Sequence, residues 1–168
     1  MAFILYRDIP EEPEGSFDEF KKCWQAYRDY LVSVKDILPK SAYEFATAEW
    51  HYNFADHKAL HDGWLEELIV REPATGERKQ HRSLEIFIRL FAAWHDGHIE
   101  LTYKNVRSYS FGKPADKLPN HRDWLNDEIR VSENGLVLHE IVWESGEWII
   151  ECENVFYEWK PFEKQSNS

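Results

Sequence analysis

The chain has 168 residues and a formal net charge of −11, with 43% hydrophobic and 30% charged residues. One domain, residues 1–168, is the simplest organisation for this length. The apolar content is too high for a disordered chain, and charged residues interrupt the apolar stretches before they reach membrane-spanning length. These features exclude disordered, fibrous and transmembrane classes, but they do not name an activity.

The charge is unevenly distributed along the chain. Residues 1–60 carry a net charge of −4, residues 61–122 of +1 and residues 123–168 of −8. An acidic surface repels phosphate backbones and anionic lipids, so the sequence predicts neither a nucleic-acid nor a membrane partner. A basic protein partner fits this surface, and so does simple solubility. The sequence sets no oligomeric state.

The two cysteines, Cys23 and Cys152, fall in a predicted helix and a predicted strand, without a CxxC or Cys/His metal-binding spacing. We interpret both as buried thiols of a reducing compartment. The apolar run at residues 1–7 has no charged leader and no long hydrophobic core, so it does not predict a signal peptide. The expectations are a cytoplasmic location and no cofactor.

Two helices are predicted before the first strand. From Ser16 to Leu38, apolar residues recur in alternating steps of three and four, at Phe17, Phe20, Trp24, Tyr27, Leu31, Val34 and Leu38. Pro39 ends this helix. The run Ser41-Ala42-Tyr43-Glu44 has the pattern of a capping box, which predicts a shorter helix from Ala42 to about Trp50.

A period of two begins at Trp64 and predicts strands. Their expected ranges are Trp64–Val70, Ser83–Phe91, Ile99–Tyr109, Trp124–Val131, Leu136–Trp143 and Trp148–Trp159. The dipeptides Asp96-Gly97, Asn134-Gly135 and Ser145-Gly146 are typical of tight hairpins. Because no helical pattern separates the strands, we expect an antiparallel sheet.

The strands form two sets that look like copies. Residues 97–106 align without a gap to residues 146–155, with the first Gly, the alternating apolar positions and an Asn-Val pair in register. A bulge at Asn105 would keep Val106 on the face of Tyr103. Trp64-Leu65 also resembles Trp124-Leu125.

The predicted fold is therefore α+β. Two N-terminal helices pack on a six-stranded antiparallel sheet or partial barrel made of two similar three-stranded units. The helical part covers residues 16–51, the first β unit residues 60–111 and the second β unit residues 123–160.

The candidates for catalysis are two pairs, His61-Asp62 and His95-Asp96. Imidazole and carboxylate groups can hold a divalent metal, and a His–Asp pair can act as a general base. Both pairs also fit ordinary roles at a strand entry and in a turn. They support one alternative function, a metal-dependent hydrolase. A second alternative is a small-ligand carrier that would use a barrel interior. The chain has no Gly-x-Ser-x-Gly elbow and few glycines for a phosphate loop, so no catalytic residue is predicted.

The acidic second unit supplies the predicted binding surface. If both units share a fold, folding does not require the extra acids of the second one. We therefore expect a basic protein partner at the face around Glu151 and Glu153, with Trp143 and Trp148 supplying apolar contact.

The run Leu60-His61-Asp62-Gly63-Trp64-Leu65, with the strands that follow it, resembles small bacterial families with a Leu-His-Asp strand entry. Residues 123–159 resemble the same kind of protein. These families are mostly uncharacterised, and some are similar to immunity proteins that neutralise bacterial toxins. The resemblance covers about residues 60–160 and brings no catalytic residues. It implies a cytoplasmic bacterial protein, a non-catalytic protein-binding module with an immunity-like role.

Overall fold

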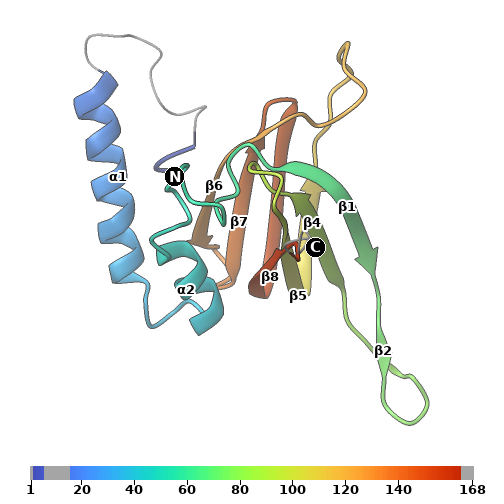
Figure 1. Cartoon of the computed structure of the whole chain (residues 1–168). Helices are drawn as coiled ribbons and strands as arrows, with labels where there is room; N and C mark the ends of the chain where they lie inside the picture. The colour runs from blue at the N-terminus through green and yellow to red at the C-terminus, as the bar shows by residue number, and fades with distance from the viewer. Residues whose placement is uncertain (1, 6–15, 164–168) are drawn as a thin grey trace.

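The computed structural model describes residues 2–5 and 16–163 (Figure 1). In this part of the chain, helices α1 (Ser16–Ser33) and α2 (Lys40–Thr47) precede the strands. The strands are β1 (Trp64–Arg71), β2 (Ala74–Thr75), β3 (His81–Arg82), β4 (Glu85–Phe91), β5 (Gly97–Phe111), β6 (Trp124–Val131), β7 (Val137–Trp143) and β8 (Gly146–Pro161). The α+β prediction is confirmed, and no described helix is long and apolar enough to cross a membrane.

Six strands form one antiparallel sheet in the order β1-β4-β5-β8-β7-β6. Each unit is a three-stranded meander, and the units join where β5 pairs with β8. Val106 pairs there with Cys152, and Tyr103 pairs with Val155. Since Val106 aligns with Val155 and Tyr103 with Cys152, the two pairs are equivalent. An approximate two-fold axis therefore passes between β5 and β8 and relates the two similar units.

The Asn-Val step behaves largely as expected. Asn105 has a φ of 50°, in the left-handed region that Asn tolerates, and Tyr103 and Val106 are both buried. The register irregularity, however, lies between Val106 and Ser108 instead of at Asn105.

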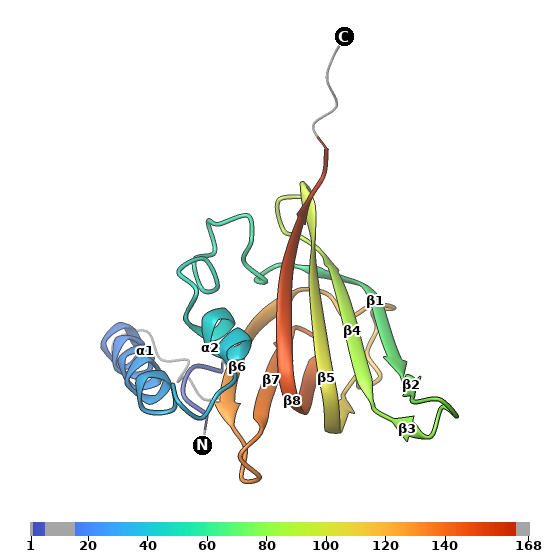
Figure 2. The same cartoon turned by 90° about the horizontal axis from the view of Figure 1, so that it is seen from below.

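The sheet curls but does not close into a barrel. The two edge strands meet at one end through a bridge between Trp64 and Asp123, and the N–H of Trp124 donates to the Gly63 carbonyl at 3.1 Å. Elsewhere β1 and β6 lie at opposite sides of the curved sheet (Figure 2). The small-ligand carrier required a closed barrel with a large interior, and this sheet does not provide one.

Apolar side chains of all six strands fill the concave face of the sheet and form one core with the helices. Helix α2 packs on β8 and β6, with Phe45 and Ala46 buried. Helix α1 runs beside β6 (Figure 1) and adds Tyr27 and Leu31 to the core.

Both helices differ in detail from their predictions. Helix α1 ends at Ser33. Val34 and Leu38 lie in the turn that follows the helix, and both side chains are buried. Helix α2 starts at Lys40, directly after Pro39, so Ser41 lies inside the helix and does not cap it. Its hydroxyl instead donates to Oδ1 of Asn154 on β8. The capping-box interpretation is therefore wrong, because a tertiary contact takes the hydroxyl.

Candidate functional site

The two His–Asp pairs predicted from the sequence differ in their contacts. Within the first pair, Nε2 of His61 lies 3.3 Å from Oδ1 of Asp62. The Nδ1 of His61 lies 2.8 Å from the Leu125 carbonyl, and its ring stacks on Phe54 at 3.8 Å. The ring of His95 packs against Phe91 at 4.6 Å.

The acid of the second pair contacts a third histidine. The carboxylate of Asp96 bonds to Nδ1 of His57, whose ring stacks on Trp94. Across residues 2–5 and 16–163, no group of three or more His, Cys, Asp or Glu side chains is arranged to hold a metal ion.

The two glutamates of the predicted binding surface are tied into the junction of the units. Glu151 is largely buried and accepts hydrogen bonds from Asn134 Nδ2 at 2.9 Å and Ser108 Oγ at 3.2 Å. Glu153 accepts one from Asn105 Nδ2 at 2.8 Å and pairs with Arg107 at 2.5 Å.

These contacts hold the pKa of each glutamate below its usual value. The causes are hydrogen bonds from Ser132 and Asn134 for Glu151, and from Arg107 and Asn105 for Glu153. Both carboxylates therefore have cross-strand partners within the chain.

The two tryptophans are not at the surface. Trp143 and Trp148 are 2% and 0% exposed, and their ring centroids lie 5.0 Å apart in the core. The expectation that these rings contact a partner is wrong. Because both faces of these strands carry large rings, the alternating pattern alone does not show which face is buried.

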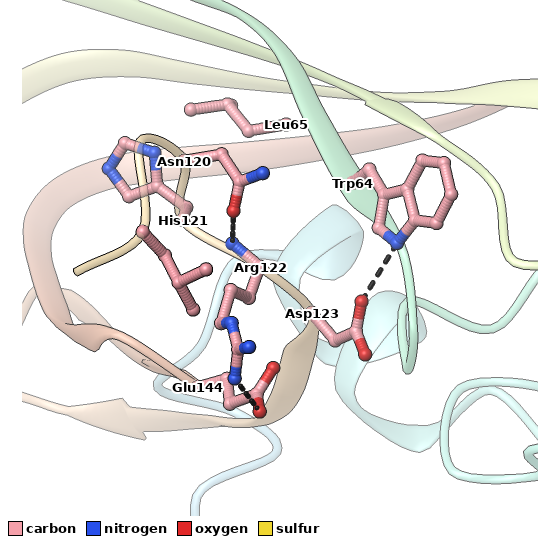
Figure 3. A pocket seen from close by; sticks show the side chains of 8 residues that line it. Trp64, Leu65, Asn120, His121, Arg122, Asp123 and Glu144 are labelled. Atoms are coloured by element: carbon pink, nitrogen blue, oxygen red, sulfur yellow. Dashed lines mark hydrogen bonds and ion pairs between the residues drawn. The ribbon is translucent and has the colours of Figure 1, made fainter. Parts of the chain in front are cut away.

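A polar pocket of about 670 Å³ lies where β1 and β6 meet (Figure 3). Its polar groups bond to one another. Trp64 Nε1 donates to Asp123 Oδ1 at 2.8 Å, and Arg122 Nη1 pairs with Glu144 Oε1 at 2.5 Å. His121 also lines it, and burial, with a smaller contribution from Lys113, lowers the pKa of this histidine. The Trp64–Asp123 hydrogen bond thus stabilises the junction of the two edges, and the Arg122–Glu144 pair ties the segment before β6 to the turn between β7 and β8.

A buried ionic cluster, which sequence reasoning missed, lies under α2. Oδ2 of Asp127 is 2.8 Å from Nε2 of His51 and 2.9 Å from Nε2 of His139. Its Oδ1 accepts a hydrogen bond from Trp124 Nε1 at 3.1 Å, and Nδ1 of His139 lies 2.8 Å from the Tyr103 hydroxyl. The Asp127 carboxylate thus links β6, β7 and the segment after α2, and His139 extends the cluster to β5.

The hydrogen bonds indicate the protons in the cluster. Nδ1 of His51 lies 2.8 Å from the Phe45 carbonyl and its Nε2 faces the carboxylate, so each ring nitrogen faces an acceptor. His139 fits a neutral ring that donates from Nε2 and accepts from Tyr103. Burial raises the pKa of Asp127, but the charge of His51 and hydrogen bonds from both histidines outweigh it and lower the pKa far below its usual value. Burial lowers the pKa of His139.

Acid is expected to destabilise the fold through this cluster. Because the folded-state pKa of His139 lies below 6.5, the unfolded state binds more protons, and stability falls as the pH drops below about 6.5. The lowered pKa of Asp127 adds stability above the unfolded value of 3.8, which is lost as the pH falls further. Thermal unfolding from pH 6 to pH 3 should show a midpoint that falls throughout. A constant midpoint between pH 6 and 5 would contradict the neutral state of His139.

An open cleft of about 870 Å³ separates α1 from the segment at residues 46–54. We call it the aromatic cleft. Its lining residues are Phe20, Lys21, Trp24, Tyr27, Arg28, Leu31, Val32, Ala46, Thr47, Ala48, Glu49, Tyr52, Asn53 and Phe54. Three of its apolar side chains are substantially exposed: Phe20 at 36%, Val32 at 69% and Phe54 at 43%.

No family model and no curated protein match this chain. Its function must therefore be argued from its own residues.

Several residues of the aromatic cleft were singled out in the sequence, but their helical apolar spacing was interpreted as contact with the sheet. Phe20 and Trp24 belong to the regular apolar spacing that predicts contact with the sheet. Val32 lies one residue beyond Leu31, outside that stripe, and its exposure is what widens the apolar surface of α1.

Proposed function

We propose that this protein is a non-catalytic protein-binding module, and that the aromatic cleft receives the apolar face of a partner's helix. The exposed apolar side chains along the cleft carry the proposal. Exposed apolar patches bounded by polar residues are typical of protein-binding surfaces. Phe20, Val32 and Phe54 would each lose water contact under a partner.

The length of the cleft favours a helix over a compact ligand. The α1 residues that line it extend from Phe20 to Val32, which at 1.5 Å per residue is about 18 Å. A groove beside three turns of one helix matches the apolar face of a second helix of similar length.

Charge and resemblance support the class of partner. A net charge of −11 attracts a basic protein and speeds its encounter. The resemblance of residues 60–160 to immunity-like families supports a cytoplasmic bacterial inhibitor of a basic toxin. The cleft lies outside the resembling segment, so the docking site depends on the exposed side chains alone.

The test uses two exposed aliphatic side chains. Val32 lines the cleft, whereas Ile37, which is 58% exposed, lies beyond the end of α1 and outside the cleft lining. The probe is a synthetic Leu/Lys peptide with apolar residues at helical spacing, titrated by calorimetry. A peptide of the same composition with scrambled spacing is its control.

We expect Val32→Asn to weaken peptide binding by about tenfold or more, because burial of a valine side chain contributes about 1.5–3 kcal/mol. Ile37→Asn should leave the affinity within about twofold of the natural protein. Equal effects of the two substitutions, or equal affinity for the scrambled peptide, would refute the cleft as the docking site.

A further inference from the structure

The two edges of the sheet are covered very differently. At β6, the Tyr27 hydroxyl accepts from the Ile129 N–H at 2.9 Å and donates to its carbonyl at 3.0 Å, and the Tyr30 hydroxyl accepts from the Val131 N–H at 2.8 Å. Tyr52 donates to the Asp127 carbonyl at 3.2 Å. Three tyrosines thus bind the outward backbone groups of β6, which blocks this edge against another strand.

The opposite edge, β1, is open. Among the described residues, no strand pairs with its outer side apart from the bridge at Trp64 (Figure 2). Ile69 and Val70 are 40% and 41% exposed on this strand. An open, apolar edge strand is a template for pairing with another chain.

The two-fold relation shows which backbone groups of β1 point outward. In the first unit, Leu68 pairs with Ile88 on β4, which in turn pairs with Leu101 on β5. In the second unit, Ile129 pairs with His139 on β7, which in turn pairs with Ile150 on β8. Since residues 101 and 150 are equivalent in the aligned strands, Leu68 corresponds to Ile129. Likewise, Val70 corresponds to Val131. The backbone groups of Leu68 and Val70 therefore occupy the outward positions that tyrosines bind on β6.

We propose that β1 of a second copy of this chain pairs with this edge, antiparallel, about a two-fold axis at Ile69. In this register Leu68 lies opposite Val70 of the second copy, and their outward backbone groups form the hydrogen bonds. Glu67 then lies opposite Arg71, so that two pairs of opposite charges flank Ile69 and its own symmetry mate. Within each copy Glu67 already pairs with Arg89 at 3.2 Å and Arg71 with Glu85 at 3.6 Å, so the contacts across the axis would extend these ion pairs. The strand is complementary to itself in charge and in apolar character.

Neighbouring registers lack this complementarity. An axis at Leu68 places Glu67 opposite Ile69, and an axis at Val70 places Arg71 opposite Ile69. An axis at Glu67 brings two copies of this acid together. Like charges, or charges facing apolar residues, oppose pairing, so the charges of β1 select the register centred on Ile69.

The ladder has defined ends. At one end, the register of β1 is irregular between Leu65 and Glu67. At the other end, β1 ends at Arg71, two residues before Pro73. Glu66 would face Glu72, but His98 and Arg82 already pair with these acids at 2.8 and 2.7 Å.

A cysteine scan tests the register directly, in the full chain with Cys23→Ser and with the buried Cys152 retained. Ile69→Cys would place two thiols opposite each other at a Cα separation of about 4.5–5.5 Å, within the range of a disulfide. Val70→Cys is matched in exposure but lies about 7–8 Å from its own mate, beyond easy bridging. Under mild oxidation, covalent dimer should form at least about tenfold faster for Ile69→Cys. Equal rates, or monomer in both variants, would overturn the proposal.

Charge exchange supplies the second test, with the dimer constant measured by sedimentation equilibrium. Glu67→Arg should weaken the dimer by about tenfold or more, because it faces Arg71 twice. Adding Arg71→Glu should restore it. Thermal midpoints confirm that each variant folds, and if Glu67→Arg does not fold, the cysteine pair decides alone. A dimer that Glu67→Arg leaves intact would count against this interface, and neither test depends on the aromatic cleft.

Discussion

Asp127→Ala is expected to lower the free energy of unfolding by about 3–5 kcal/mol, the cost of removing one partner from a buried ion pair. Without its carboxylate, the buried His51 and the Trp124 indole N–H lose their acceptor, and His139 loses the group that orients it. Urea unfolding measures the loss directly.

The matched control is Asp96→Ala. Asp96 also contacts a histidine, His57, but both side chains of this pair are about half exposed. An exposed pair contributes about 0–1 kcal/mol, so this substitution should cost little. If both alanine variants lose the same free energy, the cluster around Asp127 is not the cross-link that we describe.

Tyr27→Phe should destabilise the protein by about 1–3 kcal/mol, the range for leaving buried backbone groups unpaired. One hydroxyl pairs with both the N–H and the carbonyl of Ile129 on the edge strand β6. Burial holds the pKa of Tyr27 well above its usual value, so the hydroxyl keeps its proton at any working pH.

Tyr109→Phe is the comparison for this effect, because Tyr109 is 45% exposed on β5 and water can replace its hydroxyl partner. The urea concentration at which Tyr109→Phe is half unfolded should stay close to that of the natural protein. An equally small change for Tyr27→Phe would mean that water reaches the edge of β6 and that α1 does not exclude it.

The sheet was predictable because its pattern is local. Alternation fixes the strands, and β6 has the predicted bounds of Trp124–Val131. Residues 97–106 and 146–155, which look like copies in the sequence, lie on β5 and β8, the two strands that pair where the units join. The likeness of Trp64 to Trp124 does not extend to their environment, since Trp64 is half exposed and Trp124 is buried.

The helix ends and the short hairpin were less predictable because tertiary contacts decide them. Ser41 has the sequence of a cap, but Asn154, which is 113 residues away, takes its hydroxyl. The strands β2 and β3 have two residues each, too short for a periodic pattern.

The roles of the acids in the second unit were missed because β6 is covered on both faces. Asp127 faces the histidines on one side, and Glu128 on the other accepts the backbone N–H groups of Phe3 and Ile4 at 2.8 Å each. An acid-rich strand normally indicates a solvated face. Here the N-terminal segment and the segment after α2 bury these groups, and neither contact is visible from the spacing of residues within the strand.

Hydrogen exchange of the full chain, with and without the helical Leu/Lys peptide, tests the docking site most directly. We predict slower amide exchange at residues 20–32 and 46–54 when the peptide is bound, and unchanged exchange around Glu151 and Glu153. Protection confined to the Glu151–Glu153 strand, or no protection along α1, would contradict the assignment of the aromatic cleft as the protein-binding surface.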